Sequence, residues 1–205
     1  SVPVDNKELE PEHGMMYEVG HRWNMPGGRV NMYTGFYTIE RNNVPLARAG
    51  GFFDQIGQQR SKGAEWELRG QVGHGITLTT NYGYTQAWFS RFDAARQGRI
   101  PNFVPRHSAG FWATKQWSNG VGVSLGNRYR GKLFADNGNQ YPLGGWVTWD
   151  SAVFYRKSRF DWSVNVENVF NRQRYFVSAI YDSQVYPGTP LNIFTTLRVR
   201  LGRFN

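Results

Sequence analysis

The sequence predicts an all-β fold, the antiparallel up-and-down arrangement of a transmembrane β-barrel, and three observations support it. The chain contains about nine strand-like segments, and most of them alternate apolar and polar residues, as expected when successive residues of a strand point to opposite faces. The segments are near the 9–11 residues that a tilted strand needs to cross a bilayer. Short and long connections alternate strictly, as in membrane barrels with short periplasmic turns and long external loops.

The composition suits membrane strands better than membrane helices. Aromatic residues make up 16% of the chain and charged residues only 19%, and no apolar run approaches the roughly 18 residues of a spanning helix. Only every second residue of a barrel strand faces lipid, so the mean hydropathy of a barrel stays low. The chain has no cysteine, which excludes disulfides and thiolate metal sites.

The net charge of +9 raises the possibility of nucleic-acid binding. The basic residues are scattered through strands, turns and loops, however, and no compact basic module carries them. A basic barrel lumen, or loops that meet anionic lipid or an anionic ligand, explains them equally well. We therefore expect no nucleic-acid partner.

The first expected strands form hairpins. In the first, Tyr17, Val19 and Trp23 share a face, whereas Ile39 interrupts the alternation of the second. The expected strands cover about residues 15–24, 30–41, 64–72, 76–85, 106–117, 121–130, 147–155, 162–171 and 193–204. Short turns are expected where Gly, Pro and Asn favour tight dihedrals, at Pro26-Gly27-Gly28, Gly73-His74-Gly75, Ser118-Asn119-Gly120 and Arg156-Lys157-Ser158-Arg159. Long loops are expected at residues 42–57, 87–105, 136–143 and 171–190.

The later strands differ in how clearly they alternate. The strand at 64–72 is the clearest, with Ala64, Trp66 and Leu68 on one face. The strand at 106–117 is apolar on both parities, so its faces stay unassigned. In the segment 162–171, Trp162 and Val164 alternate with polar neighbours. A soluble β-sandwich also alternates, but aromatic residues near the strand ends and wide, charged polar faces favour the membrane barrel.

Five motifs carry a resemblance to a known family. They are Leu9-Glu10-Pro11-Glu12 ahead of Tyr17-Glu18-Val19-Gly20; Lys62-Gly63-Ala64-Glu65-Trp66-Glu67; Val104-Pro105-Arg106-His107-Ser108; Trp149-Asp150 followed by Asn165-Val166-Glu167-Asn168-Val169-Phe170-Asn171 and Arg174-Tyr175; and Tyr186-Pro187-Gly188-Thr189-Pro190. In this order, over nearly the whole chain, they resemble the C-terminal part of the barrel of TonB-dependent outer-membrane receptors, in particular the ferric-siderophore branch.

The resemblance implies a fold and a function. Family barrels have about 22 strands around an N-terminal plug, so residues 1–205 would be the C-terminal part of the barrel, without the plug and the earlier strands. The function implied is energy-coupled uptake of a ferric siderophore across the outer membrane of a Gram-negative cell. The implied partners are the siderophore, outer-membrane lipid and, through the missing N-terminal part, the TonB-ExbB-ExbD complex. Iron would enter only as the siderophore chelate, with no other cofactor.

The chain end departs from the family pattern. Such barrels usually finish on an aromatic residue, whereas here Phe204 is followed by Asn205. Either a bulge in the last strand or an altered assembly signal would account for the difference.

Candidate ligand-binding residues are aromatic and basic groups at the expected external ends of strands. The resemblance implies that such groups hold an iron chelate by stacking and by charge. The candidates are Phe52, Phe53, Trp88, Phe89, Arg91, Arg128, Arg130, Tyr141, Tyr175 and Tyr181. A place in the aromatic girdle of the membrane is the alternative for Trp88, Tyr175 and Phe176. Arg128 and Arg130 suit an anionic ligand.

The sequence shows no catalytic or metal-binding constellation. The four histidines have no partner at metal-ligand spacing. Glu65 and Glu67 share a strand face and suggest a lumen-facing salt-bridge ladder with Arg69 and neighbouring arginines more than an acid–base pair. Two other functions stay open. A passive porin or adhesin would use its loops alone, and a barrel lipase or protease would need a nucleophile or carboxylate pair with an orienting histidine.

Overall fold

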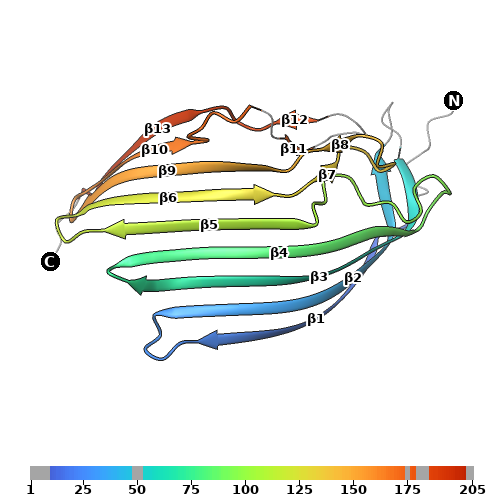
Figure 1. Ribbon diagram of the computed structural model, residues 1–205, viewed down its shortest axis with the longest axis horizontal. Helices are drawn as coiled ribbons and strands as arrows, with labels where there is room; N and C mark the ends of the chain where they lie inside the picture. The colour runs from blue at the N-terminus through green and yellow to red at the C-terminus, as the bar shows by residue number, and fades with distance from the viewer. Residues whose placement is uncertain (1–9, 48–52, 174–175, 179–184, 202–205) are drawn as a thin grey trace.

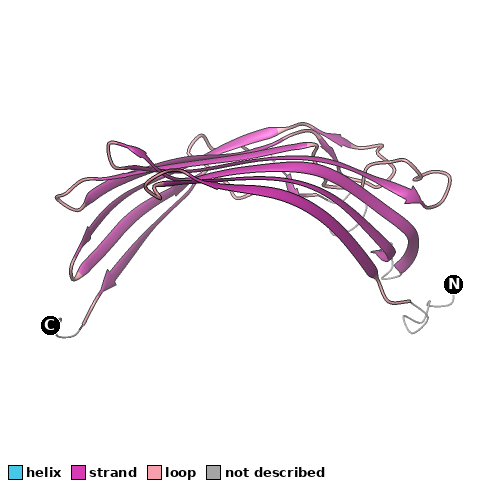
Figure 2. Cartoon of the chain, turned by 90° about the horizontal axis from the view of Figure 1, so that it is seen from below, coloured by secondary structure: helices cyan, strands magenta, loops and turns pink. Residues whose placement is uncertain are grey.

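The computed structural model describes residues 10–47, 53–173, 176–178 and 185–201, and these form an arched antiparallel sheet (Figures 1 and 2). The sheet has nine strands in the order β1-β2-β3-β4-β5-β6-β9-β10-β13. Their bounds are β1 His13–Asn24, β2 Val30–Ala47, β3 Phe53–Gly73, β4 Ile76–Arg91, β5 His107–Gln116, β6 Val121–Arg130, β9 Trp146–Lys157, β10 Phe160–Glu167 and β13 Asn192–Val199. The prediction of an all-β, up-and-down fold is confirmed.

The two long connections near the C-terminal side contain small sheets of their own. β7 (Leu133–Phe134) pairs with β8 (Pro142–Leu143), and β11 (Phe176–Ser178) pairs with β12 (Tyr186–Pro187). Within the described residues no helix is long and apolar enough to cross a membrane.

Three strands extend well beyond the predicted limits. The predicted loop at 42–57 is largely strand, because β2 and β3 stay paired as far as Ala47 and Phe53. β4 likewise continues to Arg91, so the loop predicted to start at Ala87 starts later. Apolar and polar residues do not alternate here, because Asn42-Asn43 and Gln58-Gln59-Arg60 are polar on both parities and Ala87-Trp88-Phe89 is apolar on both. The lack of alternation led to the prediction of loops. Outside a bilayer both faces of a strand can meet water, so alternation is lost while the ladder still pairs the backbone groups.

Charged pairs accompany these extensions. The guanidinium of Arg41 lies 2.6 Å from the Glu12 carboxylate, and that of Arg60 lies 2.9 Å from the Glu40 carboxylate. Because these pairs are exposed, each contributes little to stability. The last strand ends earlier than predicted, at Val199, and Phe204 and Asn205 lie outside the described residues.

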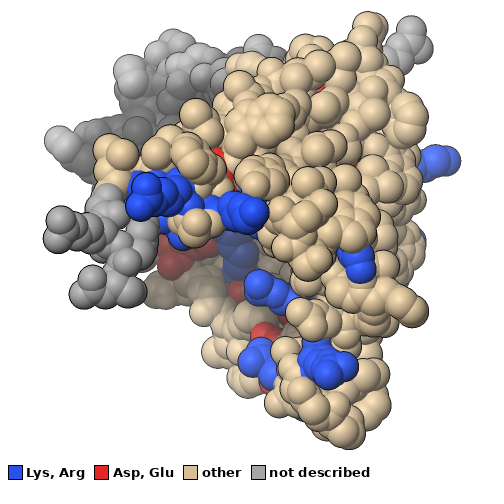
Figure 3. All heavy atoms as spheres, turned by 90° about the vertical axis from the view of Figure 1, so that its left-hand side faces the viewer, with Lys and Arg blue, Asp and Glu red and all other residues tan. Residues whose placement is uncertain are grey.

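The register assigns every strand two faces, since directly opposed residues of antiparallel strands point the same way. We call one the apolar face; it carries Val19, Phe36, Tyr82, Leu125 and Val153. We call the other the polar face; it carries Glu65, Glu67, Asn81, Arg128 and Asp150. In the view from the end where the tight turns lie, charged side chains gather mainly on one side of the arch, and fewer are visible on the opposite side (Figure 3).

The register also settles the faces of β5, which the sequence left open. His107 and Ala109 lie opposite Tyr84 and Tyr82 and therefore belong to the apolar face. Trp112 lies opposite Gly126, on the polar face, with its ring so close that a Cβ on Gly126 would collide with it. Glycine is needed there for the close approach of a large ring.

Candidate ligand-binding site

The strands have two ends with different connections. We call the end of the tight turns after β1, β3, β5 and β9 the turn end, and the end of the long connections the loop end. Six predicted site residues have described side chains at the loop end, namely Trp88, Phe89, Arg91, Arg128, Arg130 and Tyr141. Phe52, Tyr175 and Tyr181 lie outside the described residues. Phe53 begins β3, and its side chain also lies outside the described part.

The three predicted ligand-binding residues on β4 do not share one surface. Trp88 lies opposite Arg60 on the apolar face, where it is half-buried. Phe89 points the other way and is only 1% exposed, because its ring packs against Phe92 with the ring centroids 5.6 Å apart. Arg91 ends the strand and is exposed. The structure thus does not bring these three side chains together. The Phe89 ring instead packs against the connection that follows β4.

Arg128 projects from β6 on the polar face and is oriented by a carboxylate. Its Nη2 lies 2.9 Å from Oδ2 of Asp150 on β9, while the Arg128 side chain remains 64% exposed. A guanidinium has five N–H donors, so this contact orients the group and leaves most of its donors available. Two residues on, the Arg130 guanidinium lies over the ring of Trp146, 5.7 Å from the centroid, at a distance where a cation and an aromatic face attract.

Asp150 also accepts a hydrogen bond from the connection that follows β10. Its Oδ1 accepts a hydrogen bond of 2.8 Å from the backbone N–H of Asn168, just after β10. Asn168 is 2% exposed; its Oδ1 accepts from the N–H of Arg172 at 2.8 Å. Its Nδ2 donates to the carbonyls of Arg172 at 3.0 Å and Thr189 at 3.1 Å. Asp150 and Asn168, which we call the clasp, thus join the arginine to the base of the last long connection.

The clasp residues belong to a motif that the sequence reveals, but their contacts could not be predicted from it. The polar strand residues of this motif, Asp150, Asn165 and Glu167, do not all bond across strands. The Glu167 carboxylate does accept from Asn192 on β13, at 3.3 Å. Asn165 instead donates to Ser163 of its own strand at 3.1 Å.

The connections before β5 and after β6 are bound to each other by backbone and side-chain amides. Asn139 Oδ1 accepts from the N–H of Ile100 at 2.8 Å, and Asn139 Nδ2 donates to the Ile100 carbonyl at 2.7 Å. Asn137 Oδ1 accepts from the N–H of Asn102 at 2.9 Å. We call these paired connections, residues 92–106 and 131–145, the loop platform. Sequence reasoning missed it, although the run Asp136-Asn137-Gly138-Asn139 is rich in residues that hydrogen-bond backbone groups.

A buried carboxylate stabilises one side of the loop platform. Asp136 is 5% exposed, and its Oδ1 accepts from the N–H groups of Gln140 at 3.0 Å and Tyr141 at 2.8 Å. Tyr141 itself is 55% exposed. The platform therefore presents an aromatic side chain from a backbone that hydrogen bonds hold in place.

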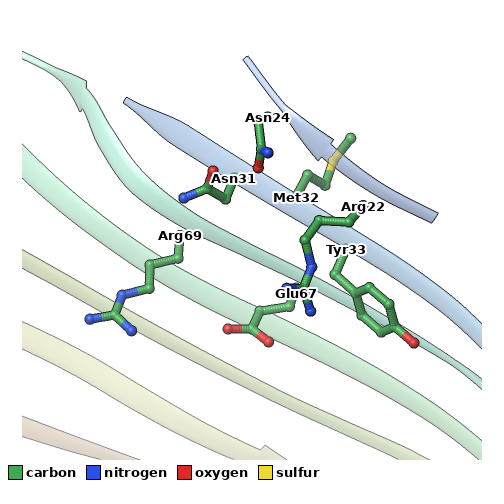
Figure 4. A pocket seen from close by; sticks show the side chains of 7 residues that line it. All are labelled: Arg22, Asn24, Asn31, Met32, Tyr33, Glu67 and Arg69. Carbon is green, nitrogen blue, oxygen red and sulfur yellow. The ribbon is translucent and has the colours of Figure 1, made fainter. Parts of the chain in front are cut away.

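The polar face carries a second group of charges at the turn end. A hollow of about 390 Å³ there is lined by Arg22, Asn24, Asn31, Met32, Tyr33, Glu67 and Arg69 (Figure 4). The predicted salt-bridge ladder is wrong, because no ion pair of Glu65 or Glu67 occurs among the described residues within 4.0 Å. The register explains it: Tyr33 and Asn81, not arginines, lie directly opposite Glu67.

No group of three or more histidine, aspartate or glutamate side chains in the described ranges could hold a metal ion. His107 instead lies among aromatic residues, with Nδ1 2.8 Å from the Tyr82 hydroxyl. What the loop end offers chemically is therefore oriented guanidinium groups and an exposed phenol, which can bind an anion or a π-system.

Comparison with known proteins gives consistent matches. A family described as "TonB dependent receptor-like, beta-barrel" matches residues 1–171. The chain is 29% identical to the ferrichrome outer membrane transporter/phage receptor of Escherichia coli K12, over 84% of this chain and 24% of that protein. It is 28% identical to the metal-pseudopaline receptor of Pseudomonas aeruginosa, over 93% of this chain and 28% of that protein. The crystal structure of the siderophore receptor PiuA from Acinetobacter baumannii superposes with a TM-score of 0.78 at 19% identity, over 97% of this chain and 30% of the other.

Proposed function

Because this chain belongs to the TonB-dependent receptor β-barrel family, we propose that it forms the C-terminal part of the wall of a ferric-siderophore receptor. Members of this family are transporters and receptors of the Gram-negative outer membrane rather than enzymes. The chain spans about a quarter of the length of the curated relatives it matches. The complete receptor would therefore perform uptake, and residues 1–205 would supply wall and loops.

The observation that supports this function best is the pair of arginines at the loop end of the polar face. Siderophores bind Fe³⁺ through hydroxamate, catecholate or carboxylate oxygens, so their chelates present anionic oxygen atoms. Arg128 is held by Asp150 yet largely exposed, so its free donors need little further ordering to meet such an oxygen. Pre-oriented donors bind more tightly because less side-chain entropy is lost on binding.

Arg130 and Tyr141 would extend the contact surface. The Trp146 ring limits the freedom of the Arg130 guanidinium, and the loop platform limits that of the Tyr141 backbone. Aromatic and cationic groups of this kind stack on the rings and planar groups of chelates. We include Trp88 and Arg91 as weaker candidates, because they point away from the Arg128 side of the sheet or end a strand.

Transport through the complete receptor would be coupled to energy. The TonB-ExbB-ExbD complex would act on a plug domain outside residues 1–205, and the barrel wall would make and break no covalent bond. A passive porin or adhesin is the competing function. Uptake of ⁵⁵Fe-labelled chelate should stop when the proton-motive force is collapsed with an uncoupler, whereas uptake that persists would indicate a passive pore.

Ligand binding can be tested in the protein purified from outer membranes in detergent. Quenching of tryptophan fluorescence would be titrated with hydroxamate, catecholate and carboxylate ferric chelates. We expect the Arg128→Gln/Arg130→Gln variant to bind the preferred chelate about 10- to 100-fold more weakly, as expected when two charge-assisted contacts are lost.

Arg198→Gln is the matched control, because Arg198 lies on the polar face near the turn end, opposite Asp161. It should bind the chelate as the unmodified protein does. Equal weakening in both variants would indicate a general effect of net charge and contradict a site at the loop end. Absence of quenching with every chelate would contradict the siderophore function itself.

A further inference from the structure

A second basic surface lies on the opposite side of the sheet. At the loop end of the apolar face, a hollow of about 520 Å³ is lined by Ile100, Val104, Arg106, His107, Tyr129, Gly131, Lys132, Leu133, Phe134 and Pro142. His107 and Tyr129 place it on the apolar face, because they stand in register with Tyr84 and Tyr82 through β4 and β5. The chelate-binding function proposed above uses none of these residues.

An adjoining hollow continues this surface towards β3. Its volume is about 310 Å³, and its lining residues are Lys62, Gln86, Ala87, Trp88, Gly98, Ile100 and Arg106. Ile100 and Arg106 line both hollows, so the two form one groove along the loop end of β3 to β6. We call it the outer groove.

The outer groove combines apolar walls with cations that have no counter-ion. Lys62, Arg106 and Lys132 are exposed. Among the described residues none of them has an ion-pair partner. In the part of the chain that the structure describes, no aspartate or glutamate lines either hollow. Uncompensated positive charge beside apolar walls fits an amphiphile with an anionic head.

The level of the groove relative to the membrane indicates which kind of amphiphile it meets. Trp88 and Tyr129 line it, and the rings of Tyr82 and Tyr84 contact His107 at its edge. Aromatic residues of membrane barrels collect at the level of the lipid headgroups. The loop end of such a barrel faces outward. The groove therefore stands at the headgroup level of the outer leaflet.

We propose that the outer groove binds a phosphorylated, acylated glycolipid of the outer leaflet. Its phosphates would lie between Lys62, Arg106 and Lys132, and an acyl chain would lie along Ile100, Val104 and Leu133. Arginine and lysine side chains are the usual partners of phosphate groups. The loop platform supports the groove, since Asn139 holds Ile100 through two hydrogen bonds.

The test uses the protein purified from outer membranes in a zwitterionic detergent, with lipid A as the probe. Native mass spectrometry counts bound lipid, and tryptophan fluorescence gives the affinity. We expect the Lys62→Gln/Arg106→Gln/Lys132→Gln variant to bind lipid A about a hundredfold more weakly, from the typical effect of three basic groups near an anionic lipid surface. Lipid A without its phosphates should bind the unmodified protein comparably weakly.

Two further variants separate the groove from general charge and from misfolding. Lys115→Gln/Lys157→Gln/Arg159→Gln removes three charges at the turn end and should leave lipid A binding unchanged. Val104→Trp fills the groove while keeping its cations, and should displace lipid A without changing the heat-modifiable migration of the folded barrel.

Three results would overturn the proposal. The first is unchanged lipid A affinity in the variant that lacks the groove cations. The second is equal loss in the two triple variants, which would indicate bulk electrostatics. The third is competition by inorganic pyrophosphate as strong as that by lipid A, which would show that the apolar part of the groove takes no part in binding.

Discussion

The connections at the two ends of the sheet are closed by hydrogen bonds that span very different distances along the chain. At the turn end, the bonds that close the tight turns join residues a few positions apart, such as Gly28 to Met25 at 2.9 Å and Gly120 to Trp117 at 3.0 Å. At the loop end, Asn139 reaches Ile100, 39 positions away, and Asn168 reaches Thr189, 21 positions away. The tight turns are therefore encoded locally, whereas the long connections depend on contacts that exist only in the folded barrel.

This difference suits the division of tasks that we propose for the two ends, with ligand binding at the loop end. A tight turn has only to reverse the chain, and Gly27, Gly28 and Gly120 adopt the positive φ angles that such turns require. A ligand surface must hold side chains from separate connections in one arrangement, which local turn chemistry does not provide. Buried Asn and Asp side chains do so here, because each can bond several backbone groups at once.

The largest effect is expected at the clasp. Asn168→Ala removes three side-chain hydrogen bonds from a site that is 2% exposed, and Asn168 has a φ of 50° that alanine tolerates less well. We expect a loss of about 2–4 kcal/mol in the free energy of unfolding. The shift of the urea midpoint in vesicle-reconstituted protein measures it. A shift no larger than that of an exposed turn variant would refute the comparison between the ends.

The next effect is expected in the loop platform. Asn139→Ala removes both side-chain hydrogen bonds to Ile100 and should cost about 1–2 kcal/mol. It should also increase amide hydrogen exchange in residues 92–106 and 131–145 together. Exchange that rises in only one of the two segments would show that the asparagine does not couple them. Because Ile100 lines the outer groove, the same variant should weaken lipid A binding.

The structure of the turn end could be predicted from the sequence more fully than that of the loop end. The four tight turns and the parity of Arg128 and Arg130 followed from local patterns, and the structure confirms both placements. The burial of Phe89 could not be predicted, because it depends on a loop that folds back and places Phe92 against the ring.

Register is the second limit on prediction from sequence. The prediction of a salt-bridge ladder at Glu65 and Glu67 was wrong, because a strand's own pattern does not say which residue lies opposite on the next strand. The faces of β5 needed the same information. Periodicity thus fixes which side a residue faces, and only the pairing of strands fixes its neighbours.

The smallest effect is expected at the turn end, where Asn119 offers the matched asparagine. Its Oδ1 accepts a single hydrogen bond of 3.0 Å, from the N–H of Val121 two positions away, at an exposed site. Water can replace that bond in the Asn119→Ala variant, so the free energy of unfolding should fall by only about 0.5 kcal/mol. The urea midpoint should barely move, and hydrogen exchange should change only next to the turn. A loss as large as that of Asn139→Ala would show that the asparagine side chain itself, rather than the sequence distance its bonds span, determines the effect.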